Sequence, residues 1–429
     1  MITTTIGKIF LTAYNQKYAT DYSPRDFFDK VYYPLFYDSN KYMQWVQNSP
    51  FVQMKKGQKV ETLLSAERQE KLSALHQKVD CGTADASIAI GYAASENKEY
   101  ATTSGQVTNI PIPLSKDDVY LSWLGSSLGV GFQGGLSVLF PDPDLLLTIF
   151  DGWTVYRKLL DSNENLKGNQ IGTWNGRWIA HRYGRDFDES DVMANFDLFE
   201  EKNGEMSIKT QSWSKALVSL ALHYKKLQMT GYVYNLGQTN TTIGFIPFVL
   251  SEIRRPVDLY KKIFGTGTAR QAEDLWGTER GLRICCQEGA IGVKAMAPKG
   301  VRKMISGETL PKIKKNDEKQ TITYNTYIIW ILAMLNNENL WDLSQEFAQS
   351  LHDYIRQDEK KLSKQKTNLV ENVLKSTTKK SFLDSLVEIV KDSNDKERIV
   401  SIAKEVNTMP SDNVPYFLTL IRFNYASIN

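Results

Sequence analysis

One set of residues has the types and spacing of a metal-dependent nuclease. Asp186 and Asp188 precede Glu200 and Lys202 along the chain. Nuclease sites of this kind use carboxylates to hold Mg²⁺ and a lysine to assist the attacking water. The run from Phe199 onward, FEEKNG, is also typical of an exposed turn. We favour the turn and keep a metal-dependent nuclease of a defence or restriction system as the alternative function.

A second candidate is a glycine pattern. Gly129, Gly131 and Gly134 match the GxGxxG pattern of dinucleotide-binding proteins. That function needs a strand before the pattern and a helix after it, so that the helix N-terminus meets the pyrophosphate. Residues 136–140, followed by Pro-Asp-Pro, instead predict a strand that ends in a turn. We therefore interpret the pattern as a glycine-rich β-loop.

Histidine and cysteine show no spacing of a metal or catalytic centre. The four histidines stand at positions 76, 181, 223 and 352, and the three cysteines form no CxxC motif. The sequence contains no nucleophile elbow, phosphate-binding loop or HExxH motif. We therefore predict no catalytic residue, no metal site and no cofactor, and we expect a protein that is not an enzyme.

Amide side chains could read base edges in a DNA groove. Residues 232–248 have the pattern of a β-hairpin, and its loop carries Asn235, Gln238 and Asn240. An amide offers both a donor and an acceptor, which hydrogen bonding to a base edge requires. These three residues are our first candidates for base reading, although amide-rich turns are also common in proteins.

A second candidate segment interleaves tryptophan with arginine. Over residues 171–185 we expect a strand that Gly176 kinks, because an unbroken strand would place Trp174 and Arg177 on opposite faces. Basic and aromatic side chains together suit a nucleic-acid backbone with exposed bases. Asn175 and Arg177 are the candidate base-reading residues there. A half-buried strand with a solvated basic face remains the ordinary alternative.

Positive charge is concentrated in one part of the chain. Residues 251–315 contain 14 Lys and Arg against 7 Asp and Glu, or +7, whereas the whole chain carries +3 and the remainder therefore −4. A local excess of cations on a nearly neutral protein is what a phosphate-binding surface needs. We predict that the phosphate-contacting residues are Arg182, Arg254, Arg255, Lys261, Lys262, Lys312, Lys314 and Lys315.

Two of these arginines precede a predicted helix. Pro256 and Gly265 predict a helix over residues 256–264, with Arg254 and Arg255 at its N-terminus. Backbone N–H groups at that end of a helix favour anions. The alternative is that both arginines are solvated or pair with Asp258.

The elements that must position these residues divide the chain into two parts. The pattern predicts helices near the N-terminus, one of them starting at Pro24 with Ser23 as its N-cap, and a helix over 217–227. It also predicts short strands with long loops over 80–149, and strands over 171–183 and 229–250. From about Thr321 it is almost wholly helical, with four apolar stripes. We therefore predict an α+β fold: a mixed N-terminal α/β region, residues 1–310, followed by a C-terminal antiparallel helical bundle, residues 321–429. Residues 300–320 would be an exposed linker.

Composition excludes several classes of protein. Hydrophobic content of 41% and charged content of 24% are ordinary for a globular chain. The longest strongly apolar run, residues 327–335, is far shorter than the roughly 20 residues of a membrane span. No secretory signal or disulfide framework is visible. We expect a cytoplasmic protein with no membrane partner.

The layout resembles a known family. Residues 42–53 (YMQWVQNSPFVQ) and 234–248 (YNLGQTNTTIGFIPF), together with a mixed N-terminal part, a basic joint and a helical C-terminal part, resemble the large subunit of type I CRISPR Cascade surveillance complexes, of the shorter I-B or I-A kind. The I-B relatives often carry zinc-binding CxxC pairs. This chain has none, so the resemblance places it in a zinc-less branch.

The resemblance implies a non-catalytic role. Such a subunit recognises the short motif that flanks the target, helps to open the DNA and recruits a helicase-nuclease. Its partners would be target double-stranded DNA and the displaced single strand, the guide RNA, the Cascade backbone subunits and the helicase-nuclease. The bundle would be similar to a small subunit, and residues 359–380, with seven Lys against two Glu, could hold the displaced strand.

A third interpretation is an assembly protein with no nucleic-acid role, whose basic stretch meets an acidic protein partner. It predicts little salt-dependent DNA binding, whereas the nuclease alternative predicts Mg²⁺-dependent cleavage by the isolated chain.

Overall fold

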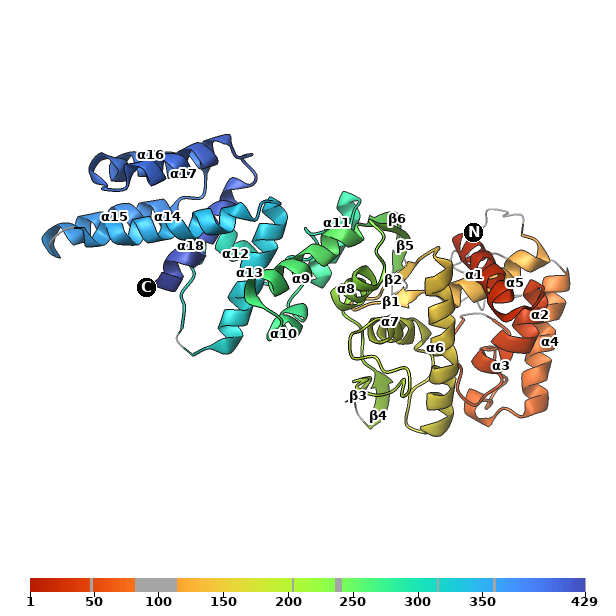
Figure 1. Ribbon diagram of the computed structural model, residues 1–429. Helices are drawn as coiled ribbons and strands as arrows, with labels where there is room; N and C mark the ends of the chain where they lie inside the picture. The colour runs from red at the N-terminus through yellow and green to blue at the C-terminus, as the bar shows by residue number, and fades with distance from the viewer. Residues whose placement is uncertain are drawn as a thin grey trace. The chain divides into compact units, whose positions relative to one another are not determined.

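The computed structural model describes residues 1–46, 49–81, 114–202, 204–235, 241–314, 316–357 and 360–428 (Figure 1). The chain forms two compact units. The first unit holds residues 1–250 with 286–290, and the second unit holds residues 251–285 with 291–429. The division comes at residue 250, earlier in the chain than the boundary at 310–321 that the sequence suggested.

The first unit is mainly helical. Its helices are α1 (Ile2–Tyr18), α2 (Pro24–Phe27), a π-helical turn (Phe28–Tyr32), α3 (Tyr33–Phe36), a 3-10 turn (Val60–Thr62), α4 (Ser65–Cys81), α5 (Lys116–Ser127), α6 (Pro143–Ser162), α7 (Ile171–Arg182) and α8 (Trp213–His223). Helices α1, α3 and α6 meet in an aromatic core, where the Trp153 ring lies 6.0 Å from Phe10 and 4.8 Å from Phe36. Ser23 caps α2 as its sequence predicts, because Ser23 Oγ accepts from the Asp26 N–H at 3.1 Å.

Helices α1 and α5 cross in direct backbone contact. A Cβ atom built at Gly7 would lie 2.0 Å from the Leu121 carbonyl oxygen, and one at Gly125 would lie 1.9 Å from the Thr3 carbonyl oxygen. Only glycine permits this approach, since any side chain would overlap the opposite backbone.

The first unit also holds both sheets. β1 (Val130–Gly131), β2 (Leu136–Leu139), β5 (Met229–Asn235) and β6 (Thr241–Phe248) form an antiparallel sheet in the order β1-β2-β5-β6, and β3 (Phe199–Lys202) pairs with β4 (Glu205–Ile208). The expected strands over 229–250 are thus confirmed as the β5–β6 hairpin. The GxGxxG pattern lies on β1 and the turn into β2, and a Cβ at Gly176 of α7 would lie 2.2 Å from the Gly131 carbonyl oxygen. The glycines therefore serve a β-loop and its packing, as interpreted.

One expectation for the first unit is wrong and another is only partly confirmed. Residues 171–182 form helix α7 instead of a strand. The described part of 80–149 holds the expected short strands, β1 and β2, but it also holds helix α5 and the start of α6 in place of long loops. The buried residues of α7 include positions 171, 174, 175, 178 and 179, which is helical spacing. The aromatic and β-branched content of this segment favoured a strand, but its periodicity is that of a helix. Residues 82–113 lie outside the described residues.

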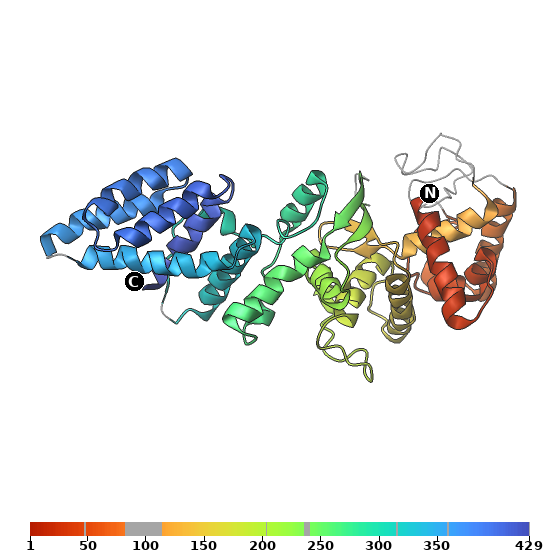
Figure 2. The ribbon, with the colours of Figure 1, turned by 45° about the horizontal axis from the view of Figure 1, so that its top comes forward.

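The second unit is helical. It contains α9 (Leu250–Phe264, from residue 251), α10 (Ala269–Glu273), most of α11 (Glu279–Glu288, up to residue 285), α12 (Val301–Ile305), α13 (Glu318–Leu335), α14 (Asn339–Arg356), α15 (Lys360–Lys375), α16 (Lys379–Asp392), α17 (Lys396–Thr408) and α18 (Val414–Ile428). Figures 1 and 2 show the helices from α14 to α18 side by side. The four apolar stripes are the buried faces of α14, α15, α16 and α17, and α18 packs on α13 and α14. The expected α+β fold with a helical C-terminal part is confirmed.

Two boundaries differ from expectation. Helix α9 begins at Leu250, so Pro256 lies inside it and the arginines at 254 and 255 lie in its body instead of at its N-terminus. Residues 300–307 are not an exposed linker, because Val301 and Met304 of α12 are buried. Among the residues that the structure describes, no helix is long and apolar enough to cross a membrane.

Candidate nucleic-acid interface

Residues 291–314, here called the basic segment, connect α11 to α13. Side chains of α13 and α18 hold the backbone of this segment in place. Trp330 Nε1 donates to the Val293 carbonyl at 2.8 Å, Tyr327 Oη donates to the Lys299 carbonyl at 2.6 Å, and Arg422 Nη1 donates to the Met304 carbonyl at 2.9 Å. The basic segment is therefore anchored to the bundle helices by its carbonyl groups, which leaves its cationic side chains on the surface.

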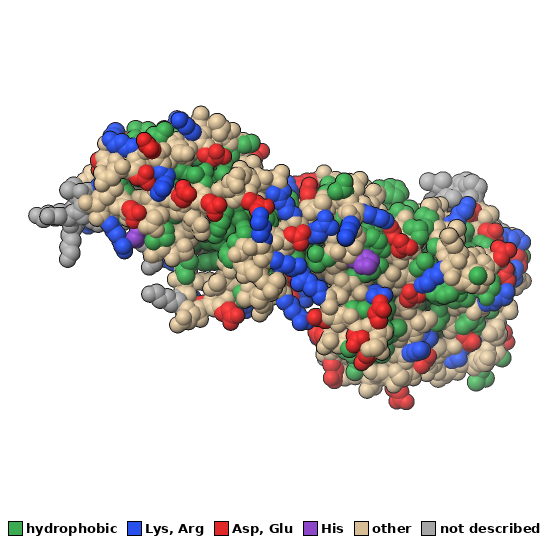
Figure 3. Space-filling view, viewed as in Figure 1, with side chains coloured by type: hydrophobic (Ala, Val, Ile, Leu, Met, Phe, Trp, Pro, Cys, Tyr) green, Lys and Arg blue, Asp and Glu red, His purple; other side chains and the backbone are tan. Residues whose placement is uncertain are grey.

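The cations of the basic segment face solvent. Glu308 is its one acidic residue, and its Lys and Arg side chains are all exposed, namely Lys294, Lys299, Arg302, Lys303, Lys312 and Lys314. Apart from Lys294, these cations form no salt bridge with any residue in the described part of the chain. Figure 3 shows a further group of Lys and Arg side chains over the surface around α9. Exposed cations without an acidic partner can bind phosphates without first breaking an ion pair within the protein.

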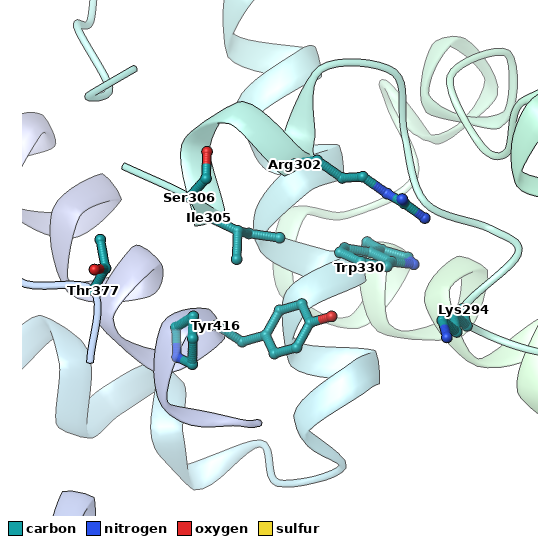
Figure 4. Close-up of a pocket in the computed structure, with 8 residues that line it drawn as sticks. Lys294, Arg302, Ile305, Ser306, Trp330, Thr377 and Tyr416 are labelled. Carbon is teal, nitrogen blue, oxygen red and sulfur yellow. The ribbon is translucent and has the colours of Figure 1, made fainter. Parts of the chain in front are cut away.

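A cavity of about 530 Å³ lies beside the basic segment (Figure 4). It is lined by Lys294, Arg302, Ile305, Ser306, Trp330, Thr377, Pro415 and Tyr416. We call it the Tyr416 pocket. No sequence pattern indicates this pocket, because its residues come from the basic segment, α13, the α15–α16 turn and α18. Among its residues, only the cations at 294 and 302 belong to a feature that the sequence singled out, the excess of positive charge.

The predicted phosphate contacts on α9 are largely occupied. Arg254 Nε lies 3.6 Å from Asp258 Oδ2, which is the alternative that the sequence left open. Arg255 donates to the Asn336 side chain, and Lys262 pairs with Glu338. Lys261 is half-buried. Of the remaining predicted phosphate contacts, Lys312 and Lys314 are exposed in the basic segment, whereas Lys315 lies outside the described residues.

Asn175 is a buried residue whose side-chain amide is hydrogen-bonded within the first unit. Asn175 is fully buried, and its Nδ2 donates to the Ser127 carbonyl at 2.8 Å and the Gly129 carbonyl at 2.9 Å. Its Oδ1 accepts from Trp153 Nε1 at 3.2 Å. Asn175 therefore joins α7 to the α5–β1 turn and to α6, and this placement contradicts the expected role in base reading.

The arginines of α7 are also engaged within the fold. Arg177 donates to Gln211 Oε1 at 3.2 Å and to the Asp197 carbonyl, and burial lowers the pKa of its guanidinium. Arg182 lies 4.4 Å from the centre of the Phe187 ring and pairs with Glu189 at 3.2 Å. Both arginines therefore contact loops of the first unit, and the Arg182 side chain, although paired, remains partly exposed.

The β5–β6 hairpin carries one of its predicted amides, whose Oδ1 is buried, and an aromatic pair. Asn235 ends β5, where it is half-buried and pairs with Leu136 of β2. Gln238 and Asn240 lie outside the described residues. On β6, Phe245 is 63% exposed, and its ring lies 5.2 Å from that of Tyr232 across the hairpin. The hairpin thus carries an exposed aromatic ring packed against a second one.

The nuclease residues are not gathered into a metal site. No group of three or more His, Cys, Asp or Glu side chains able to hold a metal ion occurs within the described ranges. Asp188 accepts from the Ser190 N–H at 2.8 Å and from Ser190 Oγ at 2.7 Å, and these bonds lower the pKa of its carboxyl. Glu200 lies on β3 opposite Ser207 of β4. The favoured interpretation of an exposed turn differs from the structure, because residues 199–202 form strand β3 of the β3–β4 hairpin.

Several lysines of residues 359–380 stabilise the bundle. Lys366 Nζ is buried 4.4 Å from the centre of the Tyr354 ring and 3.7 Å from Asp392 Oδ2. Lys379 Nζ donates to the carbonyls of Asn407 and Met409. These side chains hold helices together, so only part of the expected basic face is open to a strand.

His181 confers a pH dependence on the stability of the first unit. Its Nε2 lies 2.9 Å from the Val192 carbonyl, its ring stacks 3.9 Å from Phe196, and burial lowers its pKa from the usual 6.5. The folded chain therefore binds this proton less readily than the unfolded chain, and stability is lost as the pH falls through about 6.5. We expect Tm to fall between about pH 7.5 and pH 5.5, and to fall less in the variant His181→Gln. If the Tm of the wild type and that of His181→Gln changed with pH in the same way, this role of His181 would be contradicted.

No protein-family model, no curated protein and no solved structure matches the chain.

Proposed function

We propose that this chain is a DNA-binding protein that acts as a non-catalytic large subunit of an RNA-guided interference complex of the CRISPR Cascade type. The observation that supports DNA binding best is the basic segment. Five of its cations, Lys299, Arg302, Lys303, Lys312 and Lys314, are exposed and form no salt bridge with a described residue. Phosphate contacts of this kind are independent of sequence and position a protein on the nucleic-acid backbone.

The physical basis is counterion release. DNA carries a condensed layer of counterions, and each phosphate that a lysine or arginine neutralises sets some of them free. The slope of log affinity against log salt is about −0.9 for each phosphate contact on duplex DNA. If most of the exposed cations of the basic segment take part, we expect a slope of about −4. The paired cations of α9 add less, because they must first leave their partners.

The resemblance supports the finer part of the proposal. In this assignment the chain contacts target double-stranded DNA, the displaced strand, the guide RNA, the backbone subunits and a helicase-nuclease. We assign reading of the flanking motif to the β5–β6 hairpin, whose loop carries the amides and whose face carries Phe245 and Tyr232. Aromatic rings stack on exposed bases, and amides bond to base edges.

The test is a salt titration of duplex binding. We expect the triple variant Lys299→Ala, Lys303→Ala and Lys312→Ala to reduce the slope by about 2 to 3, because three phosphate contacts are lost. The matched control is the double variant Arg254→Ala and Lys262→Ala, which also removes cations but from existing pairs. We expect the control to change the slope by less than about 1.

Other outcomes distinguish the alternatives. A flat salt response of the wild-type chain contradicts the proposal and favours an acidic protein partner. Mg²⁺-dependent cleavage of DNA by the isolated chain favours the nuclease alternative.

A further inference from the structure

The Tyr416 pocket has the composition of a nucleotide site. Resting on the proposed DNA binding, we infer that it takes one unstacked nucleotide, with the base against the Tyr416 ring and the phosphate between Arg302 and Lys294. The basic segment would thus hold the backbone of a strand, and the pocket would select a single strand over a duplex.

The Tyr416 ring packs against a buried tryptophan and can serve as a surface on which a base stacks. It is half-exposed at the start of α18, and its centre lies 5.8 Å from the Trp330 ring at an interplanar angle of 68°. Trp330 is only 2% exposed, and its Nε1 is committed to the Val293 carbonyl. The buried tryptophan therefore supports the tyrosine edge-on and leaves the tyrosine as the ring that a base can reach.

Two cations flank the hydroxyl end of this ring. Figure 4 shows Arg302 and Tyr416 extending toward the side of the pocket where Lys294 lies. Burial raises the pKa of Tyr416, and both cations oppose this rise, as expected for positive charge close to the phenol oxygen. Asp412 acts in the other direction. The cations outnumber this carboxylate, so the position favours an anion such as a phosphate diester.

The far side of the pocket is lined by two hydroxyl groups, and the Glu308 carboxylate lies beside one of them. Figure 4 shows Ser306 and Thr377 on the side away from Lys294. Ser306 Oγ lies 3.1 Å from Glu308 Oε1, so this hydroxyl is already used as a donor, but its oxygen can still accept. The volume of about 530 Å³ lies within the roughly 300–1,000 Å³ of pockets that enclose small molecules. Room for one base and its sugar is therefore present beside the cations.

These features favour a single strand. In a duplex the base faces are stacked on one another and the edges are paired, so a recessed ring cannot reach them. An unstacked nucleotide offers both its face and its phosphate. Charge alone would attract either form of DNA, whereas the ring adds affinity only for the single strand.

The experiment compares two DNA ligands, a fluorescent 15-nucleotide oligothymidine and a fluorescent duplex, at fixed salt. We expect Tyr416→Leu to weaken oligothymidine binding about tenfold, as removal of one stacking ring does, and to leave duplex binding within about twofold. Tyr416→Phe keeps the ring and should bind the oligothymidine within about twofold of wild type. Arg302→Ala should weaken the oligothymidine more than the duplex. The matched control is Lys303→Ala, which removes an exposed cation from the same helix outside the pocket and should weaken both ligands equally.

Competition identifies the source of the ligand. If thymidine monophosphate displaces the oligothymidine more effectively than inorganic phosphate does, the pocket also accepts a free nucleotide. If neither competes while the Tyr416 effect persists, the nucleotide must belong to a strand. Equal competition by inorganic phosphate would mean that the base makes no contact, and would overturn the inference.

The two proposals fail in different ways. Wild-type chain that binds neither DNA ligand contradicts the proposed function itself. DNA binding that is salt-dependent but equal in wild type and Tyr416→Leu for both ligands overturns the pocket alone. If Tyr416→Leu does not fold, Arg302→Ala provides the test instead. The Arg302 side chain is exposed, so its removal should not affect folding.

Discussion

Replacing Arg422 with methionine is expected to lower the free energy of unfolding of the second unit by about 3–5 kcal/mol. Arg422 is only 3% exposed, and burial lowers its pKa to about 10. Its guanidinium donates to the carbonyls of Leu374 at 2.7 Å, Met304 at 2.9 Å and Ser376 at 2.5 Å. Methionine fills similar space but leaves three carbonyls without this donor, and each unsatisfied buried group costs about 1–3 kcal/mol.

The measurement is the free energy of unfolding in urea, with circular dichroism as the signal that monitors unfolding. Arg422→Lys should lie between wild type and Arg422→Met, since an ammonium group cannot match the planar fork that reaches three carbonyls. The matched control is Arg356→Met on the exposed end of α14, which we expect to change stability by less than about 0.5 kcal/mol. If Arg422→Met lowered the free energy of unfolding by less than about 1 kcal/mol, these hydrogen bonds would not be needed for the stability of the second unit.

Replacing Gly125 with alanine is expected to destabilise the first unit by about 2–4 kcal/mol. The added Cβ would lie 1.9 Å from the Thr3 carbonyl oxygen, and since this is a backbone atom, α1 and α5 must separate. Intrinsic helix propensity acts in the other direction, because alanine is better than glycine in a helix by about 1 kcal/mol. Overlap with a rigid backbone outweighs that gain. Gly7→Ala should behave in the same way, because its Cβ would meet the Leu121 carbonyl oxygen.

Thermal unfolding of the full chain provides the measurement. The control is Gly267→Ala, where no heavy atom lies within 4 Å of the added Cβ. We expect the control to keep the wild-type Tm to within about 2 °C. If Gly125→Ala instead raised the Tm, the helices could not cross as closely as the structure has them.

Local patterns determined much of the architecture. The stripes of α14 to α17 could be placed from the sequence, because each helix buries one face at a spacing that neighbours along the chain already specify. The Ser23 cap and the β5–β6 hairpin were predicted for the same reason, since caps and turns depend on residues only a few positions apart. The α+β class followed from these elements.

The count of charged residues located the basic region, but it did not show which of its cations are free of ion pairs and could bind phosphates. Composition placed an excess of +7 in residues 251–315. It could not show that Lys262 and Arg254 are paired while Lys299 and Lys312 form no salt bridge with a described residue, because pairing depends on which helix faces which. Asn175 failed as a base-reading residue for a related reason: its amide is consumed by carbonyls of Ser127 and Gly129, more than 40 positions away.

Tertiary structure alone assembled the Tyr416 pocket. Its cations come from the basic segment, its rings from α13 and α18, and its polar side partly from the turn after α15. A sequence shows the period of an element but not the partner against which the element packs. The buried donors Trp330, Tyr327 and Arg422 bring these distant parts together because a buried donor must find an acceptor wherever the fold offers one.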